Sequence, residues 1–379
     1  MQELKTIHII YSNFADIDKK EIYIGGIQNY IRSLNDIFTK KGHRVEIYQL
    51  AKRAGQEIIE GISINSYQSG KGNVLTEIKK MFNFFSDKFN EKDLIIWGTD
   101  TIGFKTDFKN VIAIQHGITF DLMYYNLLNP IWHNNFFGTI FKQLQCFKAR
   151  KNFRKYNNVV CVDYNYLNWI RTQLPRAITD KAKVIPNYAD KISNENINTK
   201  ENDSELKILF ARRFSYERGS EIMLDLIPKV LEKYPFVKFT LSGDGPYKDK
   251  FEKQFAGNDN VTITKFKVGE GDEFNLNHHI TLIPTYGSEG TSFSLLEGMA
   301  CGAIPVASNV GGMTNIVVDG FNGFLVEPTS NEYFKVIEKI ILMEKNQLRI
   351  LSENARATLE KGFSKEIWET RWLNYIEKF

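Results

Sequence analysis

The sequence predicts an α/β protein of two doubly wound domains, on the basis of its length and of a strand–helix alternation that occurs twice. The chain has 379 residues, and at about 100–200 residues per domain this length predicts two domains. Short apolar runs alternate with longer amphipathic stretches, and a polar segment at 192–205, which we interpret as a linker, interrupts the pattern once. Alternating strands and helices form parallel, helix-covered sheets, and we expect the two domains to face each other across a cleft.

The composition excludes several other classes of protein. A chain that is 42% hydrophobic, with a net charge of +4, is not intrinsically disordered, and this charge is too small to indicate nucleic-acid binding by itself. Cys146, Cys161 and Cys301 are too few for a secreted disulfide scaffold. The beginning of the chain does not resemble a signal peptide, and no apolar run approaches the roughly 18 residues of a membrane span. We therefore expect a cytoplasmic globular protein.

In the first half, five short β-branched or aromatic runs bounded by turn residues predict buried strands. These runs are Thr6–Tyr11, Arg44–Leu50, Asp93–Trp97, Val111–Gln115 and Asn158–Val162. Between the first two, Gly26–Lys41 has apolar side chains at helical spacing and is followed by Gly42, a residue type that commonly ends helices.

The second half repeats this pattern after the polar segment. Val184-Ile185 precedes the segment as one more short strand. The predicted strands beyond it are Leu206–Ala211, Val237–Ser242, Val261–Lys265, Ile280–Pro284 and Ile304–Ser308, with helices at Gly219–Lys233 and Phe293–Cys301. We place the domains at 1–187 and 188–362. Residues 363–379 form a final amphipathic helix that packs on the second domain or crosses back to the first.

The strongest motif is the segment 284–328, in which a strand end is followed by a Gly-Ser-Glu-Gly-Thr-Ser loop and a helix. Gly290, Thr291 and Ser292 open this helix, with Thr291 or Ser292 as its N-cap, and the amide groups of such an end suit a diphosphate. Glu289 precedes the helix and Glu297 lies within it, where the two carboxylates can accept sugar and ribose hydroxyls. The alternative is a solvated acidic pair, but the apolar neighbours of Glu297 disfavour it.

A second cluster, of basic residues, follows the strand at 206–211. Arg213 and Arg218 lie beyond its carboxyl end, where two cations would stabilise the negative charge of a leaving diphosphate. A surface basic cluster is the alternative. We interpret Arg212 as structural.

Glycines and one histidine provide weaker signals. Gly25 and Gly26 begin the first long helix and allow backbone to approach a phosphate, or form a plain turn. Gly243 belongs to a Gly-Asp-Gly turn after the next strand, near the expected pocket of the base. His116 follows the strand at 111–115, although a lone histidine is more commonly a core side chain.

One pair of acidic residues could suggest a metal site, but we expect that this protein binds no metal. Asp16 and Asp18 form an Asp-x-Asp pair. They lie in the loop after the first strand, where they would not be placed to bind a nucleotide diphosphate.

These motifs together resemble retaining glycosyltransferases of family 4, which have the GT-B fold. The resemblance covers nearly the whole chain. It is most specific at the Glu289–Glu297 spacing and the Gly-Met-Ala-Cys-Gly-Ala-Ile-Pro-Val run that follows. It implies that Arg213 matches the family's arginine and Arg218 its lysine, while Arg212 stands where glycine is usual. It also supports Gly25, Gly26 and His116 as site residues.

The resemblance further implies an acceptor-binding first domain and a second domain that binds a nucleotide-sugar, with a UDP-sugar as the expected donor. It implies a retaining transfer without a metal or other cofactor, in which His116, Arg213, Arg218 and Glu289 are the catalytic set. The bacterial surface-polysaccharide type of this family is the expected one, with a glycan or polyprenyl-diphosphate-linked acceptor. The alternatives are a non-catalytic partner that binds a sugar nucleotide and a GT-B nucleotide-sugar epimerase.

The stretch 122–162 contains no acidic residue and combines basic with aromatic side chains at helical spacing. Its membrane or acceptor candidates are Phe137, Phe141, Lys148, Arg150, Lys151 and Arg154. Such a stretch favours peripheral binding to an anionic membrane, here the inner face of the bacterial cytoplasmic membrane, over nucleic acid. An ordinary core helix with a solvated basic side is the alternative.

Overall fold

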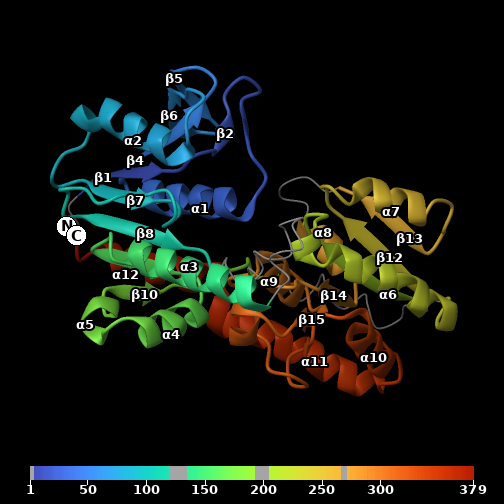
Figure 1. Ribbon diagram of the computed structural model, residues 1–379. Helices are drawn as coiled ribbons and strands as arrows, with labels where there is room; N and C mark the ends of the chain where they lie inside the picture. Colours follow the sequence, from blue (N-terminus) through green and yellow to red (C-terminus); the bar gives the residue numbers. More distant parts are fainter. Residues whose placement is uncertain (1–3, 119–134, 193–204, 266–270, 288) are drawn as a thin grey trace. The chain divides into compact units, whose positions relative to one another are not determined.

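The computed structural model describes residues 4–118, 135–192, 205–265, 271–287 and 289–379, and the chain divides into two compact units (Figure 1). The first unit comprises residues 1–116, 143–185 and 369–379. The second comprises residues 117–142 and 186–368. The end of the chain is thus assigned to the first unit.

The first unit is built on an eight-stranded sheet with the order β10-β9-β8-β7-β1-β4-β6-β5. Only β5 runs antiparallel to its neighbour. The strands are β1 (Thr6–Ile10), β4 (Arg44–Ala51), β5 (Gly55–Ile59), β6 (Ile62–Gln68), β7 (Leu94–Trp97), β8 (Val111–Gln115), β9 (Asn158–Cys161) and β10 (Ala182–Val184). A separate two-stranded ribbon joins β2 (Ala15–Asp16) to β3 (Glu21–Ile22).

Helices accompany this sheet as the strand–helix alternation predicts. They are α1 (Gly26–Lys40), α2 (Val74–Phe84), η1 (Ser86–Lys88), α3 (Asn135–Phe153), α4 (Tyr164–Gln173) and α5 (Arg176–Thr179), of which α3 begins in the segment assigned to the second unit. Helix α1 buries Tyr30, Ile31, Leu34 and Phe38 on one face, as its sequence spacing predicts.

The hairpin β5–β6 is absent from the sequence-based prediction. Its two strands are joined by Glu60 and Gly61, both with positive φ, at 51° and 79°. A two-residue turn of this kind matches the twist of paired strands and sets their register. The Glu-Gly pair between two apolar strand ends was the available signal.

The second unit contains a six-stranded parallel sheet with the order β13-β12-β11-β14-β15-β16. The strands are β11 (Leu206–Ala211), β12 (Val237–Ser242), β13 (Val261–Thr264), β14 (Ile280–Ile283), β15 (Ile304–Ser308) and β16 (Phe324–Val326). The order places β11 and β14 side by side in the middle of the sheet. The carboxyl ends of these two strands therefore meet at one edge.

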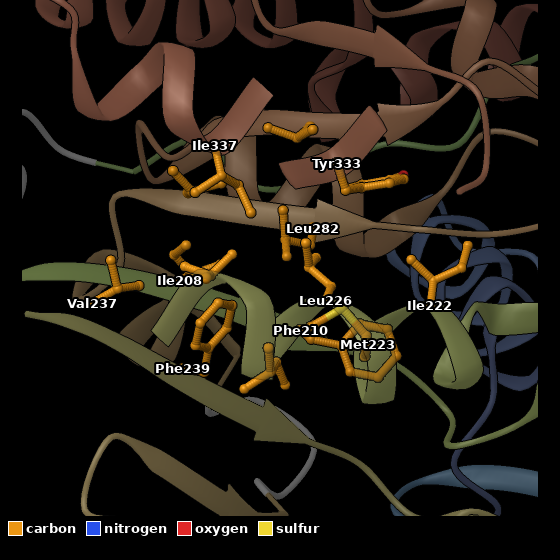
Figure 2. Packing of buried hydrophobic residues seen from close by; sticks show 14 of the residues in the cluster. Ile208, Phe210, Ile222, Met223, Leu226, Val237, Phe239, Leu282, Tyr333 and Ile337 are labelled. Carbon is orange, nitrogen blue, oxygen red and sulfur yellow. The ribbon is translucent and has the colours of Figure 1, made fainter. Parts of the chain in front are cut away.

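The helices of the second unit are α6 (Ser220–Lys233), α7 (Lys248–Gln254), α8 (Gly271–Leu276), α9 (Phe293–Ala300), α10 (Ser330–Ile341) and α11 (Lys345–Thr358). Shorter turns are η5 (Tyr216–Arg218), η6 (Gly311–Asn315) and η7 (Leu359–Phe363). Helix α12 (Lys365–Ile376) begins in this unit and ends in the first. Figure 2 shows strand residues such as Phe210 and Leu282 packed against Met223 of α6 and Tyr333 of α10. This core fixes the frame from which the strand-end loops project.

The predicted fold class is confirmed: each unit is a Rossmann-like α/β layer structure. The ten main predicted strands agree with the structure to within one residue at each end. The predicted linker at 192–205 lies almost wholly outside the described residues. Among the helices that the structure describes, none is both long and apolar enough to cross a membrane.

Candidate functional site

The candidate site of the second unit lies where β11 and β14 end. The loop after β11 runs into η5, and the loop after β14 leads into α9. Two hydrogen bonds join these elements: the Tyr286 amide donates to the Glu217 carbonyl (3.2 Å), and Ser294 Oγ donates to the Ala211 carbonyl (3.0 Å). The loops that carry the predicted cations and carboxylates are therefore adjacent.

The Glu289 carboxylate is the centre of this site. Its Oε2 accepts a hydrogen bond from Arg212 Nη2 at 2.7 Å and is also paired with Arg218 Nη1. The Glu289 side chain is 11% exposed, against 5% for Arg212 and 28% for Arg218. Two guanidinium groups thus share one carboxylate oxygen.

Arg212, which the sequence analysis treats as structural, is the buried member of this group. Its Nη1 also donates to Ser292 Oγ at 2.8 Å. Burial lowers the pKa of Arg212 to about 10, so the side chain stays protonated at neutral pH. Arg213, the predicted family arginine, is solvent-exposed on the same loop. The structure therefore brings Arg212 and Arg218 to Glu289.

The beginning of α9 has no side-chain cap. Ser292 is the N-cap residue, but its hydroxyl makes no capping hydrogen bond and instead accepts from Arg212. The Thr291 hydroxyl accepts from the Asn187 amide at 3.0 Å, and Asn187 Nδ2 donates to the Thr291 carbonyl. The Ser292 side chain therefore does not cap the first-turn amides of α9, and amides at the beginning of a helix favour an anion.

Two glycines, Gly311 and Gly312, pack closely against the backbone of the loop that contains Glu289. A Cβ at Gly311, which has φ +55°, would lie 2.1 Å from the Glu289 carbonyl oxygen, and one at Gly312 would lie 2.4 Å from the Gly290 carbonyl carbon. The Gly312 amide donates to the Glu289 carbonyl at 3.1 Å. The close approach that these glycines allow is therefore to the backbone of the Glu289 loop, which it holds in place.

The remaining donor-binding candidates of this unit lie nearby in the fold. Glu297 is half-buried on α9. Gly243 packs on the β11 loop, since a Cβ there would lie 1.9 Å from the Arg212 carbonyl oxygen. Gly219 has φ +81°, and a Cβ there would lie equally close to the Pro284 carbonyl. These glycines let the strand-end loops approach one another.

His116, Gly25 and Gly26 belong to the first unit. His116 Nε2 donates to the Gly98 carbonyl at 2.7 Å, and its ring meets Tyr30 edge-on. Burial lowers the pKa of His116 to about 4, against the opposing effect of this hydrogen bond. The imidazole is therefore neutral at pH 7, with its proton on Nε2. Gly25 is the N-cap residue of α1, which begins at Gly26, and no side chain caps this helix.

The Asp-x-Asp pair is engaged locally. Asp16 Oδ1 accepts from the amides of Asp18 and Lys19, and Asp18 pairs with Arg53. Within the part of the chain that the structure describes, no group of three or more His, Cys, Asp or Glu side chains is placed to hold a metal ion.

Helix α3 contains most of the membrane or acceptor candidates. The part of the predicted stretch before it, residues 122–134, lies outside the described residues. The large apolar side chains of α3 are 43–67% exposed at Phe136, Phe137, Ile140, Leu144 and Phe147. At 100° per residue they fall within an arc of about 100°. Phe141 is half-buried, Lys148 and Lys151 are exposed, and so is Arg154 just beyond the helix. Arg150 is half-buried and donates to Gln173 Oε1 at 3.1 Å.

Sequence reasoning missed two residues of the site, Arg212 and Asn187. The signal for Arg212 was the Arg-Arg doublet at a strand end, where only one side chain of two neighbours can point inward. Asn187 lies in the Pro-Asn-Tyr segment, more than 100 residues from its partner Thr291. No local pattern indicates that contact.

Comparisons with known proteins identify similar proteins over part or all of the chain. Residues 192–358 match the model of the family described as Glycosyl transferases group 1. An uncharacterized glycosyltransferase of Methanocaldococcus jannaschii is 32% identical over 219 residues, which span 56% of each chain. One component of the human phosphatidylinositol N-acetylglucosaminyltransferase is 22% identical over 94% of this chain and 72% of its own. The chain thus spans about half the length of the archaeal relative and more of the human one.

Among solved structures, Anabaena HepE in complex with UDP and glucose superposes with a TM-score of 0.73 at 18% identity, over the full length of both chains. At this identity the likeness concerns the fold. The matched segment 192–358 contains Arg212, Arg218, Glu289, Ser292 and Glu297. Residues 192–358 therefore resemble a glycosyl transferases group 1 domain, in a chain that has the GT-B fold.

Proposed function

We propose that this protein is a retaining, metal-independent glycosyltransferase that transfers a sugar from a UDP-sugar to a glycan acceptor. One observation carries the proposal: Glu289 and two arginines lie together at the uncapped start of α9, in the segment that matches the glycosyltransferase family. The site combines a carboxylate that can accept sugar hydroxyls with cations and amides that suit a diphosphate.

Departure of the nucleoside diphosphate is the step that this site would assist. Negative charge develops on the diphosphate as its bond to the donor sugar breaks. Groups already aimed at that charge stabilise the transition state most. Arg218 is the more exposed of the two arginines at Glu289, so we assign it to the diphosphate, together with Arg213 of the same loop and the first turn of α9.

Retention of configuration follows in this proposal from a front-face attack, in which the leaving phosphate takes the acceptor proton. A covalent double displacement would need a carboxylate nucleophile beside the donor sugar. Glu289 is already engaged by two guanidinium groups, which disfavours that role. His116, neutral at pH 7, serves as a hydrogen-bonding group toward the donor sugar, and Gly25 and Gly26 as backbone near the phosphates.

In this proposal the UDP moiety, including its ribose, binds to the second unit. Glu297 on α9 accepts the ribose hydroxyls, and the turn at Gly243 borders the base. The similar HepE structure holds UDP and glucose, which supports a UDP-sugar for this chain.

The acceptor in this proposal is lipid-linked, and the pathway is assembly of a bacterial surface polysaccharide such as O-antigen, capsule or exopolysaccharide. The exposed apolar arc of α3, with Lys148 and Lys151, supports peripheral attachment to the inner face of the cytoplasmic membrane. The name of the human relative also includes a phospholipid, phosphatidylinositol.

A donor screen followed by one substitution tests the proposal. UDP-, GDP- and dTDP-sugars are compared by thermal shift, and the donor with the largest shift is assayed for hydrolysis and transfer. Arg218→Ala should lower kcat by about 10²-fold, the usual loss when one charge-stabilising donor is removed. Arg349→Ala, which removes an exposed arginine of α11, should leave kcat unchanged.

Two outcomes would contradict the proposal. If the wild-type protein binds a UDP-sugar but neither hydrolyses nor transfers it, the protein is a binding partner and not an enzyme. If Arg218→Ala retains kcat within about threefold, Arg218 does not stabilise the leaving group.

A further inference from the structure

Arg212 occupies a position where the family that this sequence resembles has glycine, and the side chain that it adds reaches the site. Its guanidinium bridges two loops: Nη2 donates to Glu289 Oε2 at 2.7 Å and Nη1 donates to Ser292 Oγ at 2.8 Å. Both partners flank the short segment 290–291 that leads into α9. The bridge therefore fixes the carboxylate relative to the beginning of that helix.

The two arginines at Glu289 are not equivalent. Arg212 is 5% exposed and donates hydrogen bonds from both of its terminal nitrogens, whereas Arg218, which pairs with the same carboxylate oxygen, is 28% exposed. Breaking a buried ion pair leaves an uncompensated buried charge, so Arg212 does not leave its partners readily. Arg218 is closer to solvent and can exchange its partner at lower cost.

We propose that Arg212 is a positioning residue: it holds Glu289 and Ser292 in place while the more exposed Arg218 moves from the carboxylate to an anionic ligand. This inference rests on the proposed function and deepens it. Arg212 acts through Glu289 and Ser292 and does not itself contact the sugar.

Removal of Arg212 would change the site in two ways. The Glu289 carboxylate would be left with Arg218 alone, which strengthens that ion pair and withholds Arg218 from the diphosphate. The Ser292 hydroxyl would be released and could cap α9, since serine is a favoured N-cap residue, and so compete for the amides that an anion would use. Both changes weaken transfer without any loss of a group that touches the donor.

The test is a double-mutant cycle in the full-length protein between Arg212→Met and Glu289→Gln. We expect Arg212→Met to lower kcat for the UDP-sugar found in the donor screen by about tenfold or more, but by less than about threefold when Glu289→Gln is already present. Arg212→Lys, which keeps the charge and one contact, should recover part of the loss. Arg349→Met controls for the type of substitution and should have no effect.

Equal losses from Arg212→Met in both backgrounds would overturn the positioning role. A wild-type protein without transfer activity would instead overturn the proposed function, and the same four proteins then test the Arg212–Glu289 coupling by urea unfolding. A double variant that loses less stability than the sum of the single variants supports the coupling, and an additive loss refutes it. If Arg212→Met does not fold, Arg212→Lys takes its place in the cycle.

Discussion

The Glu289 carboxylate accepts from two guanidinium groups at one oxygen, so a substitution at this residue also changes what Arg218 can do. Glu297 lies eight residues further along the chain, half-buried on α9. In our proposal the first contacts the sugar and the second the ribose. The two glutamates should therefore respond differently to ligands with and without the sugar.

We predict that Glu297→Gln weakens the binding of free UDP, because a ribose contact is lost, by about tenfold for one charged hydrogen-bonding group. Glu289→Gln should leave UDP binding unchanged or strengthen it, since Arg218 is released from the carboxylate, while transfer falls. Calorimetric titration with UDP and with the intact UDP-sugar measures both effects. Equal losses for both variants with both ligands would refute this division.

At the scale of the element, α3 combines exposed apolar side chains with exposed basic ones. Its exposed apolar arc, Phe136, Phe137, Ile140, Leu144 and Phe147, is followed by Lys148 and Lys151. Five large apolar side chains of α3 are 43–67% exposed, although Phe153 at its end is buried. This exposure favours the membrane-binding interpretation of the basic stretch.

We expect the protein to co-sediment with anionic liposomes at low salt, and to do so less as salt increases, because each cation near the surface contributes about 1 kcal/mol. Changing Lys148, Lys151 and Arg154 together to Gln should abolish most of this binding. The matched control changes Lys335, Lys345 and Lys361, exposed lysines of the second unit, and should retain it. Failure of the wild type to bind anionic liposomes would exclude direct docking and favour a soluble acceptor.

At the scale of the whole molecule, helix α12 contributes residues to both units. Trp368 is assigned to the second unit and packs against Tyr188, with ring centroids 4.5 Å apart. Trp372, one turn later, belongs to the first unit, and its Nε1 donates to the Tyr30 hydroxyl at 2.8 Å. Both tryptophans are buried. Through Trp372, the end of the chain therefore packs against Tyr30, near its beginning.

We predict that Trp372→Ala destabilises the first unit and Trp368→Ala the second, each by about 3–5 kcal/mol, the usual cost of truncating a buried tryptophan. The two variants are matched in residue type and helix. Urea unfolding followed by hydrogen exchange on peptides of each unit separates the effects, because a two-unit chain need not unfold in one step. If either variant destabilises both units equally, α12 acts as one cooperative element.

The sequence by itself determined the fold class and indicated most residues of the candidate site. Periodicity located the ten main strands to within one residue, because an apolar run of a given length has few other ways to be buried. The strand-end loops and the Glu289–Glu297 spacing are local patterns, and the family resemblance added the expected chemistry. The hairpin at 55–68 was missed, although its Glu-Gly turn was visible.

Only the tertiary structure decided which neighbouring side chains meet. Arg212 and Arg213 are the same residue type one position apart, yet backbone direction buries one beside Glu289 and exposes the other. Asn187 contacts Thr291 across 104 positions, and Gly311 supports the Glu289 loop from a later turn. Such contacts depend on the packing of β11 beside β14 and on loops that fold over their ends, and no local pattern encodes the packing of segments distant in the chain.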